Sequence, residues 1–353
     1  MRRVILNLHL AIGLAAGLII VVLGATGAIL AFEPELDRLS HRHISYIKPG
    51  GRALSLVEIG NAISLKYPGE SIIAYLPSSA PDLSTQVILS RGIVSVNPYT
   101  GQVLGLRTRG QSFLGVVRAL HVRLATGEIG RAIVKWSTFA TLLSVISGLY
   151  LWWPVKRMRI GGRLWSARFW YDLHSSVGFF SLLPVVVLVA TGTVIGFEDE
   201  AKWFIDRVPA ARAINKGESI AAPALKSERN QISPDQAVAL ACAQLPGAVT
   251  SRVQMPQFGG SYVVGLDDRQ SRFTGEQNFI SLDPSSGRII SIRLASSLSS
   301  GQRFMALNDA IHTGNIWGMP TQIVALVTSL LVPLQAVSGL LIWLRRKGFV
   351  YAR

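Results

Sequence analysis

The stretch Leu8-His9-Leu10-Ala11-Ile12-Gly13 opens an apolar run that continues to Phe32-Glu33. A second run has the same pattern, from Leu173-His174 to Phe197-Glu198. In both runs, counted from the histidine, a glycine follows at +4 and the glycine of an Ala-Thr-Gly triplet at +18. A phenylalanine at +23 and glutamates at +24 and +26 complete the match. This agreement at fixed offsets indicates an internal duplication with a period of about 165 residues.

The apolar residues of the chain are concentrated in a few runs. The chain has 353 residues, of which 49% are hydrophobic. A membrane-spanning helix needs about 20 mostly apolar residues, and four runs reach this length, at roughly 7–32, 133–153, 175–197 and 321–344. The first run is longer than a signal-peptide core of about 7–15 residues. We therefore expect it to be an uncleaved span in a multi-pass membrane protein that contacts the lipid bilayer.

The net charge of +15 reflects basic residues at the ends of these runs, so we expect no nucleic-acid partner. Basic residues precede the first run, occupy the loop 156–172 and follow the last run in 345–353. All these ends fall on one side, and the positive-inside rule places them in the cytoplasm. The more polar segments 33–118 and 198–310 are then expected in the periplasm, outside a bacterial inner membrane.

Each outer segment has the pattern of a small α+β module. Apolar spacing predicts a helix over 54–66 in the first segment, and Ser233-Pro234-Asp235 begins a helix in the second. Short apolar runs typical of antiparallel strands follow each helix. The turns Asn97-Pro98-Tyr99-Thr100-Gly101 and Asp283-Pro284-Ser285-Ser286-Gly287 match in position and type. The two modules are therefore also expected to be copies of each other.

The predicted fold class is a four-helix transmembrane bundle, formed by duplication, with two periplasmic α+β modules. Its order along the chain is a transmembrane helix (1–32), a first module (33–118), an interfacial segment with a second transmembrane helix (119–155), a cytoplasmic loop (156–172), a third transmembrane helix (173–197), a second module (198–310), an interfacial segment with a fourth transmembrane helix (311–344), and a cytoplasmic tail (345–353).

Four of the six histidines occupy equivalent positions near the ends of the predicted spans. His9 and His174 begin the first and third spans; His121 and His312 each stand 27 residues before the glycine of a Ser-Gly-Leu motif. Because repeat-related spans enter the membrane from the same side, we expect His9 to face His174 and His121 to face His312. Imidazole is a common axial ligand of haem iron. Each pair is therefore predicted to bind one non-covalent haem b through two axial histidines. The two haems would lie near opposite faces of the membrane.

Small residues follow some of these histidines by about one helical turn. Gly13 and Gly178 stand four residues after His9 and His174, on the same helix face, and predict a flat slot for a porphyrin. Ala125 would act similarly after His121, whereas Ile316 after His312 is bulky.

Other polar and small-residue features have more ordinary interpretations. For the Ala-Thr-Gly triplets the preferred interpretation is close helix packing. His41 and His43 are expected in a solvated loop, with metal capture as the alternative. The glutamates that follow Phe32 and Phe197 are expected to mark the boundary between the membrane and water.

The combined pattern L-H-x3-G…A-T-G…F-E, H…S-G-L-x-L/I-W and D/N-P-x-T/S-G resembles the PepSY-associated transmembrane family over residues 9–343. The family includes iron-regulated inner-membrane proteins, and some members are similar to ferric-siderophore reductases that carry two b-type haems. The resemblance implies PepSY-like modules, haem iron ligation by His9, His121, His174 and His312, and electron transfer to a periplasmic ferric siderophore.

The sequence also bears on the source of the electrons. It contains no G-x-G-x-x-G motif, so the electron donor is expected to be external, either membrane quinol or a cytoplasmic reductase. No residue stands out as catalytic. Two alternative functions remain open: a non-enzymatic membrane protein that binds a peptide, a protease or a signalling partner, and a metal transporter that uses the histidines as relay ligands.

Overall fold

The computed structural model describes residues 1–108, 112–156, 158–163, 166–205, 207, 231–257, 259–268 and 277–349. The predicted segments 33–118, 156–172, 198–310 and 345–353 therefore lie partly outside the described residues. The chain divides into two compact units. We refer to residues 1–33, 113–204 and 307–353 as the membrane unit, and to residues 34–112 and 205–306 as the sheet unit.

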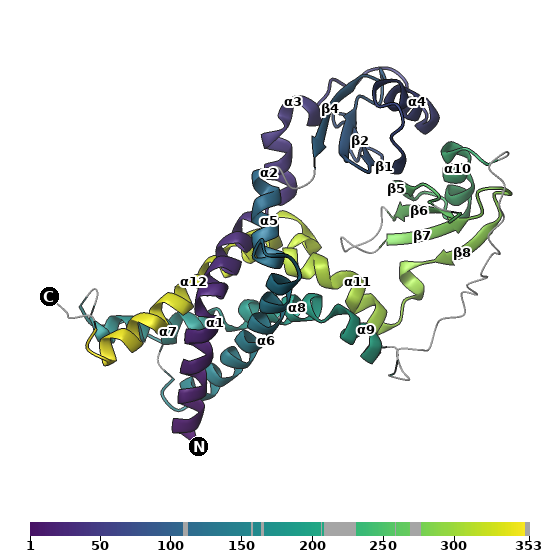
Figure 1. Cartoon of the computed structure of the whole chain (residues 1–353). Helices are drawn as coiled ribbons and strands as arrows, with labels where there is room; N and C mark the ends of the chain where they lie inside the picture. Colours follow the sequence, from purple (N-terminus) through teal and green to yellow (C-terminus); the bar gives the residue numbers. More distant parts are fainter. Residues whose placement is uncertain are drawn as a thin grey trace. The chain divides into compact units, whose positions relative to one another are not determined.

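Long apolar helices form the membrane unit (Figure 1). Three of them are long and apolar enough to cross a bilayer: α1 (Arg2–Leu30), α6 (Gly127–Trp152) and α12 (Met319–Arg346). A fourth candidate span is a bent pair, α7 (Ala167–Phe180) and α8 (Leu182–Gly196). Shorter helices flank these spans, namely α5 (Phe113–Arg123), α9 (Glu198–Ile205), α11 (Ser300–Thr313) and the 3-10 helix η3 (Asn315–Trp317).

The bent pair corresponds to the transmembrane helix predicted over 173–197, which the structure breaks into two helices. The axes of α7 and α8 meet at 71°, and the break is at Ser181. Pro184 stands in the first turn of α8 and has no backbone N–H, so the carbonyl of Phe180 loses its usual helical partner. Pro333, in contrast, lies inside the unbroken helix α12. A proline alone does not decide whether a span breaks.

Helices α1 and α12 approach each other closely at Gly24. A Cβ added to Gly24 would lie 2.6 Å from Cγ of Pro333 and 2.7 Å from the carbonyl oxygen of Ser329. The second of these atoms is backbone and cannot rotate away. Glycine at this position is therefore what allows α1 to contact α12 beside its proline.

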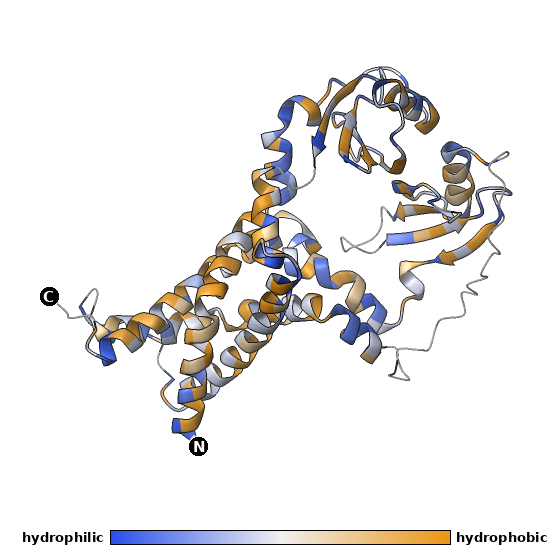
Figure 2. Cartoon of the chain, viewed as in Figure 1, coloured by the Kyte–Doolittle hydropathy of each residue, from blue (hydrophilic) through white to orange (hydrophobic). Residues whose placement is uncertain are grey.

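Residues of high hydropathy occur along the long helices of the membrane unit (Figure 2), and many of their apolar side chains are exposed. Leu18 of α1 is 77% exposed and Ile146 of α6 is 58% exposed. Exposed apolar surface of this extent is typical of contact with lipid. Inside each helix the backbone groups bond one another, as the membrane interior requires.

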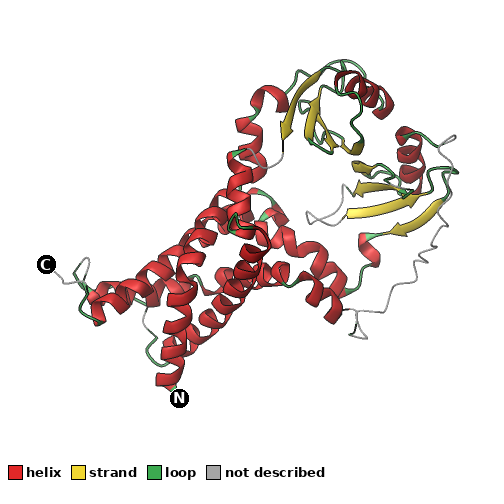
Figure 3. Ribbon diagram, in the orientation of Figure 1, coloured by secondary structure: helices red, strands yellow, loops and turns green. Residues whose placement is uncertain are grey.

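The sheet unit contains one antiparallel sheet of eight strands, in the order β4-β3-β2-β1-β5-β6-β7-β8 (Figure 3). The strands of the first half are β1 (Ile72–Leu76), β2 (Thr85–Leu89), β3 (Gly92–Val96) and β4 (Val103–Thr108). The strands of the second half are β5 (Val249–Gln254), β6 (Tyr262–Asp267), β7 (Gln277–Leu282) and β8 (Ile289–Arg293).

In both halves of the sheet unit one helix precedes four strands. The helix is α4 (Leu56–Lys66) or α10 (Pro234–Gln244), and both helices start with a capping box, formed by Ser55 with Glu58 and by Ser233 with Gln236. In the first half, the short helices α2 (Glu33–Ser40) and α3 (Arg42–Ser45) come before α4. The predicted turns are also present: the N–H of Gly101 bonds the carbonyl of Asn97, and the N–H of Gly287 bonds that of Asp283. The local signals in the sequence thus identify these elements correctly.

The sequence predicted two α+β modules. In the structure the two halves share one sheet and one core. Strand β1 pairs with β5 through Tyr75 opposite Val253. Residues of both halves are buried in the same core, including Ile59 and Ile63 of α4 and Ala237 and Ala241 of α10. An isolated half would leave the edge of β1 or β5 unpaired, and pairing of these edges satisfies their backbone groups.

A charged contact also joins the halves. The carboxylate of Asp235, in the first turn of α10, accepts hydrogen bonds from the backbone N–H groups of Leu56 (2.7 Å) and Val57 (2.9 Å). These N–H groups belong to the first turn of α4, which has no helical acceptors for them. Asp235 therefore caps a helix of the other half.

The close contact at Gly24 yields a stability prediction. Gly24→Ala should lower the free energy of unfolding of the membrane unit by about 1–3 kcal/mol, because the new methyl group overpacks the contact. Gly17→Ala is the matched control, since Gly17 lies in the same helix and an added Cβ meets nothing within 4 Å. Thermal unfolding of both variants in detergent measures the difference. Equal unfolding temperatures would contradict the contact.

Candidate functional site

Two pairs of histidines meet inside the membrane unit. The first pair is His9 of α1 and His174 of α7, with ring centroids 6.3 Å apart. The second pair is His121 of α5 and His312 of α11, also with centroids 6.3 Å apart. The structure thus brings together the same four residues, in the same combinations, that the repeat pattern singles out. They come from four different helices.

Each ring of the first pair is held by a helix other than its own. Nδ1 of His9 lies 3.1 Å from the carbonyl oxygen of Ser144 and 3.0 Å from Oγ of Ser147, both in α6. Nδ1 of His174 lies 3.1 Å from the carbonyl oxygen of Gln335 and 3.0 Å from Oγ of Ser338, both in α12. The two environments are nearly identical.

The second pair repeats this arrangement on two further helices. Nδ1 of His121 lies 3.1 Å from the carbonyl oxygen of Leu23 and 3.0 Å from Oγ1 of Thr26, in α1. Nδ1 of His312 lies 3.1 Å from the carbonyl oxygen of Leu188 and 3.1 Å from Oγ1 of Thr191, in α8. Each of the four rings therefore contacts two groups of a neighbouring helix. One is a backbone carbonyl, and the other is the side-chain hydroxyl of the residue three positions further along that helix.

A glycine completes each of these four contact sites, which we call the imidazole seats. A Cβ added to this glycine would lie close to Cε1 of the ring. The four glycines, with this distance and the histidine concerned, are Gly148 (3.2 Å, His9), Gly339 (3.4 Å, His174), Gly27 (3.1 Å, His121) and Gly192 (2.9 Å, His312). A seat thus consists of a carbonyl, a hydroxyl three residues later and a glycine immediately after it.

The seats explain the Ala-Thr-Gly triplets, for which the sequence favoured helix packing, and the Ser-Gly-Leu motifs, which served only to mark the repeat. The Thr-Gly of each Ala-Thr-Gly triplet and the Ser-Gly of each Ser-Gly-Leu motif form the hydroxyl and glycine of a seat. The packing interpretation was incomplete because the partner of these small residues is a histidine ring. The shared [Ser/Thr]-Gly dipeptide at all four sites was the available signal.

The seats determine which ring nitrogen carries the proton. A carbonyl oxygen only accepts hydrogen bonds, so a neutral ring that bonds it uses Nδ1–H as the donor; at His174 the side-chain carboxamide of Gln335 also lies 3.1 Å from Nδ1. Nε2 is then unprotonated and has a free lone pair. In the part of the chain that the structure describes, Nε2 of these four histidines makes no hydrogen bond. Each pair therefore offers two nitrogen ligands.

The separation within each pair suits one metal ion between two imidazoles. Two metal–nitrogen bonds of about 2 Å, with about 1 Å from each nitrogen to its ring centre, put the centroids about 6 Å apart. The separation of the ring centroids in the structure is 6.3 Å in both pairs. Within the described residues no group of three or more His, Cys, Asp or Glu side chains could hold an ion, so each pair provides two ligands.

The two pairs lie at opposite ends of α1. His9 and Thr26, which is part of the seat of His121, are 17 residues apart, or about 26 Å at 1.5 Å per residue. Between these positions α1 contributes Ala16 and Ile20 to a buried apolar cluster, which also contains Val185, Val189 and Val332. The pairs are therefore separated by a dry, apolar interior of nearly membrane thickness.

The glycines expected to form slots differ in their surroundings. An added Cβ on Gly13 meets nothing within 4 Å, whereas on Gly178 it would lie 3.4 Å from the Gln335 carboxamide. Ala125 does not follow His121 along a helix face, because α5 ends at Arg123 and Ala125 has a positive φ of 56°. Ile316 lies in η3, after the helix that carries His312 has ended. The one-turn argument therefore fails for these last two residues.

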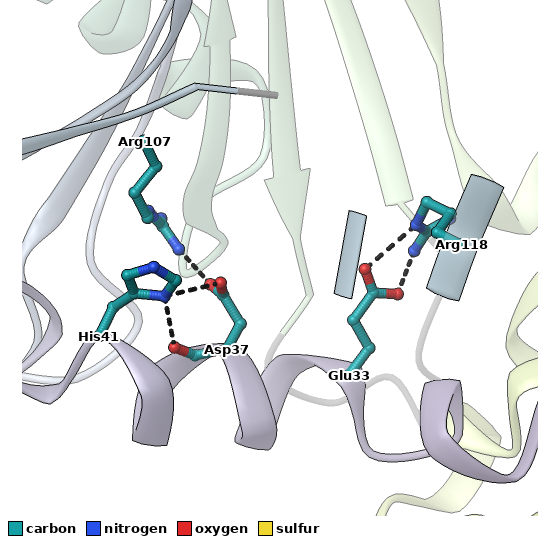
Figure 4. A network of polar contacts seen from close by, with 5 residues as sticks. All are labelled: Glu33, Asp37, His41, Arg107 and Arg118. Carbon is teal, nitrogen blue, oxygen red and sulfur yellow. Dashed lines mark hydrogen bonds and ion pairs between the residues drawn. The ribbon is translucent and has the colours of Figure 1, made fainter. Parts of the chain in front are cut away.

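His41 and His43 lie outside the pairs, in the sheet unit. Nδ1 of His41 lies 3.2 Å from the Asp37 carboxylate, which also forms an ion pair with Arg107 of β4 (Figure 4). His41 is thus part of a polar network rather than a solvated loop, while His43 is exposed. In the membrane unit, Glu33 forms an ion pair with Arg118 of α5 (Figure 4). The Glu33–Arg118 ion pair links α5, the helix that carries His121, to the residues that follow α1.

The seats predict a specific tautomer for each paired histidine. In the purified apoprotein labelled with nitrogen-15 histidine, the ring nitrogen shifts of His9, His121, His174 and His312 should show a protonated Nδ1 and a bare Nε2. The exposed His43 should show the tautomer mixture of a free imidazole and serves as internal reference. Single His→Asn variants assign the signals. A protonated Nε2 in the paired residues would contradict the arrangement of the seats.

A comparison with family models agrees with the motifs in the sequence. The model of the PepSY-associated TM region matches residues 6–346, which includes all four paired histidines and all four seats. A search of curated proteins finds no match. The apolar spans and this nearly complete match lead to one conclusion: the chain is a membrane protein that belongs to the PepSY-associated transmembrane family.

Proposed function

We propose that this protein is an inner-membrane oxidoreductase that binds two b-type haems and carries electrons across the membrane. The observation that supports the proposal is the double histidine pair. Each pair has two bare Nε2 atoms, ring centroids 6.3 Å apart and a separate seat for each ring. The two pairs lie at opposite ends of α1 and so provide one redox site toward each end of the apolar barrier.

The residues of each pair fit a haem better than a bare metal ion. A porphyrin supplies four equatorial nitrogens and leaves two axial positions, which two imidazoles fill. His9 and His174 would hold one haem, and His121 and His312 the other. A bare transition-metal ion usually takes at least three protein ligands, and the described residues provide two at each site.

The chain's own residues would position and tune these ligands. A hydrogen bond from Nδ1–H to a carbonyl fixes the ring orientation and raises the basicity of Nε2. The seat glycines remove side chains that would push the rings out of position. Ala16, Ile20 and Val189 exclude water between the sites. Bound haem iron changes between ferric and ferrous states and so supplies one-electron transfer.

We further propose that the electron acceptor is a ferric siderophore on the outer side of the membrane. Two features support this direction: the basic residues at the ends of the spans, which favour cytoplasmic termini, and the ferric-siderophore reductases that the motifs resemble. Iron would be released because ferrous iron binds such chelators weakly. The donor would be membrane quinol or a cytoplasmic reductase.

Absorption spectra of the purified full-length protein test haem binding. The wild-type protein should show a bis-histidine b-type spectrum with two haems per chain, and each single His→Ala variant should lose one of them. Because the members of a pair share one haem, His9→Ala and His174→Ala should lose the same spectral component, and His121→Ala and His312→Ala the other. His43→Ala, in the sheet unit, is the control and should retain both.

Two outcomes of this experiment, and one of a separate vesicle transport assay, would redirect the assignment. A colourless wild-type protein would favour the peptide- or protease-binding alternative. Metal uptake into vesicles without any redox partner would favour a transporter. If the variants lost haem in other combinations, for example His9→Ala together with His121→Ala, the pairing would be wrong.

The acceptor is tested separately with reduced protein in nanodiscs. Addition of a ferric hydroxamate chelate should reoxidise the bound haem, and a ferrous-specific chromogenic chelator should trap one ferrous ion for each electron lost. The gallium chelate of the same ligand has the same charge and nearly the same size but accepts no electron. Reoxidation by the gallium chelate, or none by the ferric chelate, would contradict the proposed substrate.

A further inference from the structure

An apolar groove lies beside the first histidine pair. It has a volume of about 710 Å³ and is lined mainly by α7, α8 and α12, through residues that include Ser176, Phe180, Pro184, Ile323 and Val327. The groove occurs at the 71° bend between α7 and α8, where a straight span would have packed along α12. A site among membrane-spanning helices is accessible to molecules dissolved in the bilayer.

One hydroxyl group in the wall of this groove has no partner. Oγ of Ser176 is buried and makes no hydrogen bond, and the residue is only 3% exposed. The neighbouring hydroxyls of Ser181 and Thr328 bond carbonyls of their own helices. An unsatisfied polar group in an apolar wall is costly, and a ligand with a buried oxygen atom would satisfy it.

Two helices, α7 and α12, carry both lining residues of the groove and residues of the first pair's site. Val177 lines the groove and follows His174 by three residues, which is about 4.5 Å along the axis of α7. Leu331 also lines the groove and precedes Gln335 by one turn of α12. The carbonyl of Gln335 is part of the seat of His174. A flat ring in the groove would therefore lie next to the first pair.

A second, more polar cavity lies next to the groove. It has a volume of about 450 Å³ and shares the lining residues Met158 and Ile160 with the groove. Lys156, Arg159, Arg168 and Asp172 also line it. This neighbouring cavity is the nearest polar surrounding for protons released in the groove.

We propose that this groove binds a membrane hydroquinone, which donates electrons at the first pair. The inference rests on the proposed redox function and identifies its donor. Oxidation of one hydroquinone breaks two O–H bonds, and the two protons leave to water through the second cavity. The two electrons reduce two ferric ions of the chelate substrate to ferrous ions, one electron each. Ser176 binds an oxygen of the quinone ring.

A lipid acyl chain is the obvious other occupant of an apolar groove. It carries no polar atom at the depth of Ser176 and would leave that hydroxyl unsatisfied. A quinone ring has oxygen atoms on a flat apolar body, with an isoprenoid tail that can extend into the bilayer. The chemistry of the wall therefore favours the quinone.

Binding is tested with a photoreactive azidoquinone added to the full-length protein in nanodiscs, followed by mapping of the labelled peptides. Label is expected on the α7 and α12 segments that line the groove. Val327→Trp fills the groove and should lower this labelling by about tenfold or more. Leu330→Trp is the matched control, because Leu330 lies in the same helix, is similarly exposed (54% against 48% for Val327) and does not line the groove. Ser176→Ala should weaken quinone binding about fivefold through loss of one hydrogen bond.

Electron entry is tested with the same variants. Reduction of the bound haem by decylubiquinol should slow by about tenfold or more in Val327→Trp, while haem content and reduction by dithionite stay as in Leu330→Trp. Identical behaviour of the two tryptophan variants, label outside the groove, or displacement of the label by fatty acid but not by decylubiquinone would overturn the proposal. A haem-free wild-type protein would refute the proposed function alone, since azidoquinone labelling does not depend on haem.

Discussion

The membrane unit depends on one repeated interaction, the hydrogen bond from an imidazole Nδ1–H to a carbonyl oxygen of another helix. It occurs four times, at distances of 3.1 Å. A carbonyl inside a helix is already an acceptor for the helix itself, but it has a second lone pair. The hydroxyl three residues later and the glycine after it allow the ring to reach that lone pair. Each of these bonds ties two helices together and orients a ligand.

This interaction links the fold to the proposed chemistry. Helices α1 and α8 hold the rings of the second pair, while α6 and α12 hold those of the first pair. Helix α1 also supplies His9, so it takes part in both sites. Gly24 and Pro333 then bring α1 against α12. The packing of the spans and the positions of the ligands are therefore not independent features.

In the sheet unit, two similar halves combine by pairing their edge strands rather than by packing one sheet face on another. Strands β1 and β5 pair in the middle of the sheet, and Asp235 caps the helix of the other half. Each half supplies one helix to a common core. Burial of the phenol in this core raises the pKa of Tyr75 to about 12, with the Asp235 carboxylate as a further cause. Tyr75 thus remains neutral at physiological pH, as a core residue should.

The sequence by itself determined the features that depend on neighbouring residues. The apolar length of the spans, the capping boxes of α4 and α10 and the turns at Gly101 and Gly287 all follow from local patterns. The repeat offsets also singled out the four paired histidines, because equivalent residues on duplicated helices occupy equivalent places. Only the tertiary structure decided the seats, the bend at Ser181 and the joining of β1 to β5. His9 and Ser144 are 135 residues apart, and no local pattern specifies which carbonyl will face a distant ring.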